Sequence, residues 1–208
     1  SILPVRVEDG MIWSEMHKGI IAQKVFRDAL ENDDLETVKK LLHSLKENLL
    51  KSADVMENNN DSFMIENAIG DSSVNYGPVL QKAFIDMTFY NAFWEKGELV
   101  FFDQEWCFER IPLNFCLYYS IKSAYTKADV DTEIQLNDLL KFVGVDESEH
   151  EGYNRLEDFI WSKILYRQTD FYGAEGYCNR FSDDITLQGQ QNQRLEGQNQ
   201  RLEGQNQR

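Results

Sequence analysis

Two aspartates and an asparagine stand out because their residue types and spacing suit one kind of chemistry. Asp86 ends an apolar run at 83–85, Asp103 ends another at 100–102, and Asn91 lies between them. Carboxylate and amide oxygens are ligands that Mg²⁺ prefers, and a carboxylate can receive the proton of an attacking hydroxyl. The pattern therefore favours phosphoryl transfer, with Asp86 as the base and Asn91 and Asp103 as magnesium ligands.

A tight turn at Lys96 and Gly97 would bring these three side chains together, because two-residue turns join neighbouring antiparallel strands. Counting outward from the turn pairs Asn91 with Phe102, so that Asp103 returns to within one residue of Asn91. Asp86 precedes Asn91 by five residues, across a loop. The spacing predicts that the trio meets at one end of a small sheet. The alternative is loop chemistry, since Asp and Asn favour turns anyway.

The elements that must position the trio are mostly helical. The pattern predicts a strand over 1–9 that turns at Gly10, a polar loop over 52–78, and the hairpin described above. An Asn-Asp-Asp cap at 32–34 precedes a leucine stripe, and Pro112 suits the first turn of another helix. Helices are predicted over 14–29, 35–51, 112–125, 132–143 (capped by Asp131 or Thr132) and 148–166, the last after a solvated acidic run at 146–149. The expected fold class is α+β.

Composition limits the function classes. The chain has 208 residues and a formal net charge of −15, which opposes binding to nucleic acid. Its three cysteines form no CxxC pair, so a disulfide framework is not expected and a cytoplasmic location is favoured. No apolar run reaches the ~18 residues that a membrane span needs, and no signal peptide is visible.

The spacing Asp86-x-x-x-x-Asn91, with Asp103 twelve residues further on, resembles the catalytic loop and metal-binding aspartate of the protein-kinase-like fold in its aminoglycoside-phosphotransferase-type branch. More narrowly, FFDQEW followed by Ile111-Pro112 resembles the kinase module of bacterial bifunctional methyltransferase–kinases that terminate O-antigen chains. The resemblance implies a kinase-like C-terminal lobe over 1–184 and a coiled coil over 185–208.

The same resemblance implies the chemistry and its setting. ATP and Mg²⁺ would be the cofactors, and a sugar hydroxyl of a surface polysaccharide would be the acceptor. PVRVEDG at 4–10 is similar to the hinge strand beside adenine, which would place Val5, Val7 and Glu8 at the nucleotide; an edge strand is the alternative. The protein would be cytoplasmic, at most peripheral at the inner face of the membrane, with a glycosyltransferase as a possible partner.

Several departures from that pattern favour a second hypothesis. Phe84-Ile85 stands where the family has His-Arg, and Thr88 stands where it has a phosphate-contacting lysine. The chain also has no Gly-rich phosphate loop and no N-lobe Lys–Glu pair, so an N-lobe is expected upstream of Ser1. The alternative function is a non-catalytic kinase-like scaffold that oligomerises through its coiled coil and positions partner enzymes.

The end of the chain repeats QNQRLEG with a period of seven residues. With Leu195 and Leu202 at heptad position d, every asparagine of the repeat falls at position a, which is tolerated in parallel coiled coils and fixes their register. Glycines at the outward position f each cost about 1 kcal/mol of helix propensity. The pattern predicts a parallel homo-oligomer through 185–208, and a disordered polar tail is the alternative.

We expect the tail to associate weakly alone, because two leucines per chain bury little apolar surface. Sedimentation of the protein extended by several QNQRLEG heptads should show oligomers, with a gain in helicity by circular dichroism. A strictly monomeric species at high micromolar concentration, with no gain in helicity, would contradict the coiled coil.

Overall fold

The computed structural model describes residues 5–8, 11–14, 18–57 and 62–172. The chain forms two units, Ser1–Asp158 and Phe159–Arg208. The predicted coiled coil at 185–208 lies outside the described residues and stays a prediction.

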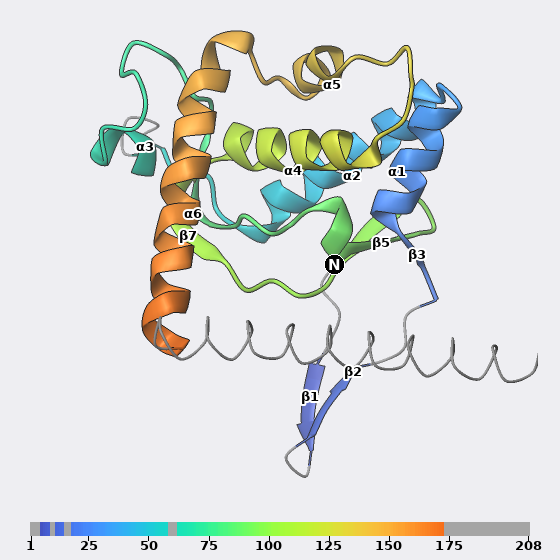
Figure 1. Cartoon of the computed structure of the whole chain (residues 1–208), viewed down its shortest axis with the longest axis horizontal. Helices are drawn as coiled ribbons and strands as arrows, with labels where there is room; N and C mark the ends of the chain where they lie inside the picture. Colours follow the sequence, from blue (N-terminus) through green and yellow to red (C-terminus); the bar gives the residue numbers. More distant parts are fainter. Residues whose placement is uncertain (1–4, 9–10, 15–17, 58–61, 173–208) are drawn as a thin grey trace, which may run out of the picture. The chain divides into compact units, whose positions relative to one another are not determined.

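The strands of the first unit form three small antiparallel sheets (Figure 1). The first sheet pairs β1 with β2, the second has the order β3-β5-β6, and the third pairs β4 with β7. The strands are β1 (Val5–Glu8), β2 (Met11–Ser14), β3 (Ile20–Ile21), β4 (Val79–Phe84), β5 (Ala92–Glu95), β6 (Glu98–Phe101) and β7 (Cys107–Pro112).

Helices supply most of the described structure, which confirms the α+β class. They are α1 (Ala22–Glu31), α2 (Leu35–Ser52), α3 (Phe63–Glu66), α4 (Leu113–Ala128), α5 (Leu136–Val143) and α6 (His150–Tyr172), with short 3-10 turns η1 (Phe89–Asn91) and η2 (Glu147–Glu149). Within the described residues, none of these helices combines the length and apolar character needed to cross a bilayer.

Helix α2 carries the leucine stripe that the sequence predicts, and this stripe forms much of the core. Asp34 caps the helix, its carboxylate accepting from the N–H of Thr37 at 3.0 Å. The apolar residues that recur every three or four positions are all fully buried: Val38, Leu41, Leu42, Leu45 and Leu49. Each buried aliphatic side chain contributes about 1.5–3 kcal/mol, so this face fixes α2 in the core.

The prediction of a helix over 14–29 is wrong in its first half. Residues 11–14 pair with β1, and Ile20–Ile21 pairs with β5 opposite Trp94 and Phe93. The helix begins only at Ala22. β-Branched residues such as Ile suit a strand, and here tertiary pairing outweighs the helical periodicity.

The helix predicted over 132–143 begins later, at Leu136, after the cap position Gln135. Thr132 does not cap it, because its hydroxyl donates to the Asp33 carboxylate at 2.7 Å. The N–H of Glu133 donates to the same carboxylate oxygen at 2.9 Å. The polar loop predicted over 52–78 is also partly wrong, since it contains α3.

The acidic run before α6 is only partly solvated. Asp146 and Glu149 form a capping box around η2, and the Glu149 side chain is 3% exposed. The Glu149 carboxylate accepts from the N–H of Asp146 at 2.8 Å and from Asn114 Nδ2 at 3.1 Å. Burial raises its pKa. These bonds attach the beginning of α6 to α4.

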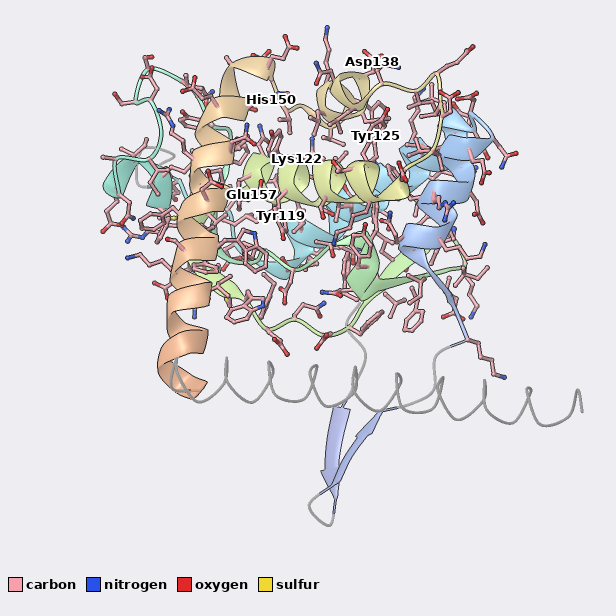
Figure 2. The ribbon with its side chains drawn as sticks, viewed as in Figure 1. Tyr119, Lys122, Tyr125, Asp138, His150 and Glu157 are labelled. Atoms are coloured by element: carbon pink, nitrogen blue, oxygen red, sulfur yellow. The ribbon has the colours of Figure 1, made fainter. Side chains whose placement is uncertain are left out.

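A second polar connection joins the same helices (Figure 2). Lys122 of α4 donates to Asn154 Oδ1 at 2.8 Å and forms an ion pair with Glu157 at 3.0 Å. The hydroxyl of Tyr118, one turn earlier on α4, donates to the same Asn154 oxygen at 2.9 Å. Tyr118 is 5% exposed and packs in the core.

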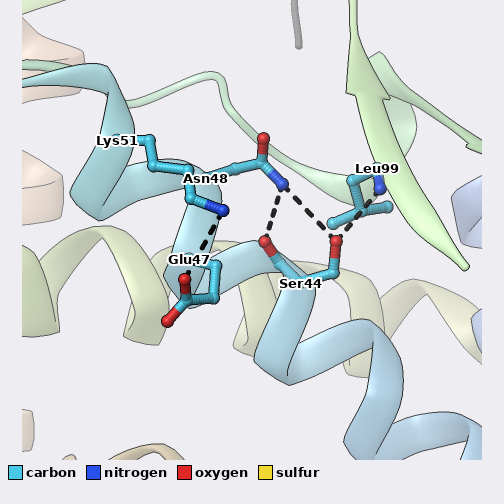
Figure 3. Close-up of polar contacts among 5 residues, drawn as sticks. All are labelled: Ser44, Glu47, Asn48, Lys51 and Leu99. Carbon is cyan, nitrogen blue, oxygen red and sulfur yellow. Dashed lines mark hydrogen bonds and ion pairs between the residues drawn. The ribbon is translucent and has the colours of Figure 1, made fainter.

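Ser44 of α2 holds the β5–β6 hairpin against the helix, as Figure 3 shows. β6 is an edge strand of its sheet, and the N–H of Leu99 donates to Ser44 Oγ at 3.0 Å. Asn48 Nδ2 donates to the Ser44 carbonyl at 2.8 Å and approaches Oγ at 3.4 Å. Because buried backbone N–H groups must be paired, this hydroxyl completes the edge of the sheet.

The Ser44→Ala variant should lose about 1–3 kcal/mol of unfolding free energy, because it leaves the buried Leu99 N–H without an acceptor. The higher helix propensity of alanine offsets a few tenths of this loss. Urea unfolding measures the effect. Ser162→Ala is the control, since Ser162 is exposed on α6 and its hydroxyl bonds only its own helix, to the Phe159 carbonyl. Equal stabilities of the two variants would contradict the role of Ser44.

Candidate functional site

The hairpin that carries the site has the predicted register. Lys96 and Gly97 both have positive φ, 53° and 85°, which is the conformation of a type I′ turn. Ala92 pairs with Phe101, and the N–H of Phe102 donates to the carbonyl of Asn91 at 2.9 Å. The hairpin therefore returns the chain to Asn91, as the spacing predicts.

Asp86 lies where the β4–β7 ladder ends. The N–H of Ile85 donates to the carbonyl of Trp106 at 3.0 Å, which continues that ladder. The Asp86 carboxylate then accepts from two backbone N–H groups through the same oxygen, Oδ2: from Glu105 at 2.5 Å and from Trp106 at 3.2 Å. These bonds fix the orientation of the carboxylate against the segment that carries Asp103.

Asn91 ends η1 and faces back to the beginning of its own loop. Its Nδ2 donates to the backbone carbonyl of Asp86 at 3.0 Å. This bond uses the donor end of the amide, so the amide oxygen keeps its lone pairs for a ligand. The side-chain contact directly confirms that Asp86 and Asn91 lie together.

Asp103 is exposed and has a left-handed backbone conformation, with φ of 59°. Its charge is one cause of the raised pKa of Asp86, whose main cause is burial of the Asp86 carboxyl. The N–H groups of Glu105 and Trp106 act in the opposite direction. Phe102, which precedes Asp103, bonds the Asn91 carbonyl, and Asn91 bonds the Asp86 carbonyl, so the three predicted site residues lie at one end of the hairpin.

Apolar residues surround Asp86, at the positions where the kinase-like pattern described above has a histidine and an arginine. Ile85 and Met87 flank Asp86 and are each 3% exposed, and Thr88 is 6% exposed. The loop is thus held by packing and by backbone hydrogen bonds, with Thr88 N donating to the Asp86 carbonyl at 2.8 Å. Glu105 is exposed, and it contributes its backbone N–H to the site.

Gln104 is a site residue that sequence reasoning missed. Its Nε2 donates to the carbonyl of Phe102 at 2.5 Å, so the side chain spans Asp103. Its Oε1 is buried and accepts no hydrogen bond, and the same is true of Asp86 Oδ1. No local signal in FFDQEW distinguishes Gln104 from a solvent-facing residue, because its burial depends on the fold.

The sheet beside the trio has an aromatic outer face that the sequence analysis also missed. Ala92 and Phe101 are buried on the inner face, whereas Phe93, Val100 and Phe102 are half-buried. The rings of Phe93 and Phe102 lie 4.7 Å apart with an interplanar angle of 36°. The sequence offers no clear signal for this face, because the apolar runs at 92–94 and 99–102 do not alternate with polar residues. Such a surface suits the stacking of a planar ring.

A magnesium ion with ATP fits these residues. Among the described residues, no three His, Cys, Asp or Glu side chains gather as a metal site. Mg²⁺ bound with a nucleotide needs only one or two protein carboxylates, the remaining ligands being phosphate oxygens and water. Asn91 and Asp103 would supply the protein oxygens, and Asp86 Oδ1 is a further oxygen that accepts no hydrogen bond from the described residues.

The predicted nucleotide residues Val5, Val7 and Glu8 all lie in β1. Among the described strands β1 pairs with β2, which places Val7 opposite Ile12 and Glu8 opposite Met11. Their role beside adenine stays a prediction.

A groove of about 620 Å³ lies at a different place, between α2, the β5–β6 turn and Phe142. Two ion pairs lie along this groove: Lys39 approaches Glu36 at 3.7 Å, and Lys51 approaches Glu47 at 3.5 Å. None of the site residues lines it. Chemistry favours the Asp86 end of the hairpin as the candidate site, because carboxylate and amide oxygens suit phosphoryl transfer.

Comparison with known proteins returned no matching family model, no matching curated protein and no matching solved structure.

The raised pKa of Asp86 predicts how stability depends on pH. Between the unfolded value, about 3.9, and the higher folded value the folded protein binds more protons, so the unfolding free energy falls as pH rises. Asp86→Asn removes this ionisation. The variant should therefore gain stability relative to wild type as pH rises from acid to neutral, measured by urea unfolding.

The control for this pH series is Asp131→Asn, which removes one negative charge from an exposed position of the same acidic protein. An Asp86→Asn variant that loses stability relative to wild type as pH rises, or that changes with pH as Asp131→Asn does, would contradict the buried, ionisable role of Asp86.

Proposed function

We propose that this protein is a phosphotransferase that moves the γ-phosphoryl group of ATP to a sugar hydroxyl, on a bacterial surface polysaccharide. The observation that carries the proposal is the meeting of Asp86, Asn91 and Asp103 at one end of the hairpin, with Asp86 Oδ1 buried and unpaired. Phosphoryl transfer depends on positioning and on neutralising charge; these oxygen groups would position the acceptor and hold the magnesium that neutralises the phosphate charge.

Asp86 acts as the base in this mechanism. Its Oδ2 is held by two N–H groups, so Oδ1 has a fixed direction in which to accept the proton of the acceptor hydroxyl. As that proton moves to Asp86, the acceptor oxygen bonds to the γ-phosphorus, the bond to the bridging oxygen breaks, and ADP leaves. The raised pKa of Asp86 makes it a stronger base than an exposed aspartate.

Asn91 and Asp103 hold magnesium, which would neutralise the phosphate charge when bound with ATP. This matters in a chain of net charge −15, which would otherwise repel a nucleotide triphosphate. The half-buried rings of Phe93 and Phe102 give the base a stacking surface beside the metal ligands.

The acceptor class and cellular setting rest on the resemblance of 86–106 to O-antigen chain-terminating kinases. In this setting the protein is cytoplasmic, at most peripheral at the inner face of the membrane, and works beside a glycosyltransferase. The heptads at 185–208 would join several copies.

A non-catalytic scaffold is the second candidate function, and one observation favours it. Both backbone N–H bonds to Asp86 Oδ2 connect β4 to the segment before β7, which is a structural role that needs no substrate. Addition of ATP and magnesium to the protein with its expected N-lobe separates the candidates: an enzyme should show a magnesium-dependent rise in melting temperature, and a scaffold should not.

In the full-length protein, Asp86→Asn should lower the rate of phosphoryl transfer about 10²- to 10⁴-fold, the usual effect of losing a general base. Asp103→Ala should lose activity together with the magnesium-dependent thermal shift. Transfer of ³²P from labelled ATP to purified polysaccharide measures the rates, with Asp131→Asn as the exposed control. Undiminished transfer in Asp103→Ala would refute the metal role.

A further inference from the structure

The groove beside α2 has the size of a small-molecule site. Its volume is about 620 Å³, within the range of about 300–1,000 Å³ that is usual for ligand pockets. It is lined by one face of α2, by Gly97 and Glu98 at the β5–β6 turn, and by Phe142 of α5. Because α2 packs against both β6 and α5, the folded chain brings these three linings together.

Positive charge gathers at the Phe142 end of this groove. Helix α2 has four lysines and two glutamates, a formal charge of +2 in a chain of −15. Lys39, Lys40 and His43 all line the groove, and they span little more than one helical turn. The ring of Phe142 lies 5.7 Å from Lys39 Nζ. An anionic group entering at this end would meet two ammonium groups and an imidazole.

These cations are available to a ligand. The ion pair of Lys39 with Glu36 is long, at 3.7 Å, and Glu36 is mostly exposed, so the pair contributes little. Lys40 acts on the exposed Asp34 carboxylate through its charge, but within the described residues it forms no ion pair. An anion can therefore replace these weak partners.

The opposite end of the groove has the other sign. There Lys51 pairs with Glu47 at 3.5 Å, as Figure 3 shows, and Glu98 adds a further carboxylate to the lining. This end would repel a second anionic group. The groove thus suits a ligand with one phosphate group better than one with three.

Phe142 supplies an apolar surface beside the cations. Its side chain is 49% exposed, although it is a large hydrophobic residue. An exposed aromatic ring stacks well on the planar ring of a ligand, and a nucleobase is such a ring.

We propose that this groove binds a nucleoside monophosphate, with its phosphate between Lys39, Lys40 and His43 and its base on Phe142. Lysine ammonium groups and imidazole N–H groups are donors to phosphate oxygens. None of Asp86, Asn91 and Asp103 lines the groove, so this site is separate from the one proposed for phosphoryl transfer and requires no metal.

Titration calorimetry on the full chain tests the proposal with three probes: AMP, ribose 5-phosphate and adenosine. EDTA is present, because it removes the magnesium on which nucleotide binding at the Asp86 end would depend. AMP should bind at least 10-fold more tightly than either of the other probes, since each of them lacks one of the two recognised groups.

Two substitutions separate the two halves of the site, and both replaced side chains are exposed, so the variants should fold. Lys40→Gln should weaken AMP and ribose 5-phosphate alike, by about 10-fold, through the loss of a charged donor. Phe142→Ala should weaken AMP by about 10-fold and leave ribose 5-phosphate unchanged. Lys24→Gln is the matched control, because Lys24 is an exposed lysine of α1 that pairs with Asp28 and does not line the groove.

Three results would overturn the proposal: no binding of AMP at millimolar concentration, equal affinities for AMP and ribose 5-phosphate, or equal effects of Lys24→Gln and Lys40→Gln. Asp103→Ala locates the bound nucleotide. Unchanged AMP affinity in this variant supports the groove, whereas lost affinity would place AMP at the Asp86 end and refute it. None of these results bears on phosphoryl transfer, which is tested with magnesium and ATP.

Discussion

The two hydrogen bonds from backbone N–H groups to Asp86 Oδ2 are the constraint on which the site depends. They join the end of β4 to the segment before β7, and the Asn91 amide adds a bond to the Asp86 carbonyl. Hydrogen bonds that a carboxylate accepts are shorter and stronger than those to a neutral acceptor. Three segments separated in sequence, at 86, 91 and 103–106, therefore have one common attachment point, and none of their positions is independent of the others.

The hairpin that brings Asp103 to this point is fixed at its other end by α2. Ser44 supplies the acceptor that the edge strand β6 lacks, while Leu41 and Leu45 on the same helix are fully buried. An edge N–H buried without a partner would favour slippage or fraying of the strand. The placement of the hairpin against α2 thus depends in part on one hydroxyl in the middle of a core helix.

Features that depend on neighbouring residues could be predicted from the sequence, whereas features that depend on distant residues could not. The β5–β6 register was predictable because a two-residue turn fixes it locally, although lysine is an unusual first residue for that turn. The beginning of α5 was not, because Asp33, 99 residues earlier, accepts the Thr132 hydroxyl that looked like a cap. The β2 and β3 strands likewise depend on distant partners. In the site, the trio follows from spacing, whereas the burial of Gln104 is a property of the folded chain.

A buried polar atom without a hydrogen-bond partner costs free energy of folding, so the position of each such atom calls for an explanation. Within the described residues these atoms belong to Gln23, Asp86, Gln104, Ser120 and His150. Three of them lie on or at the beginning of helices, whereas Asp86 Oδ1 and Gln104 Oε1 lie in the loops beside the hairpin. The Asp86 carboxylate cannot relieve this by rotation, since its other oxygen is held by two N–H groups. An acceptor oxygen that is held in a fixed direction needs no reorganisation to receive a donor or a cation, which is why the orientation of the Asp86 carboxylate supports the proposed phosphoryl transfer.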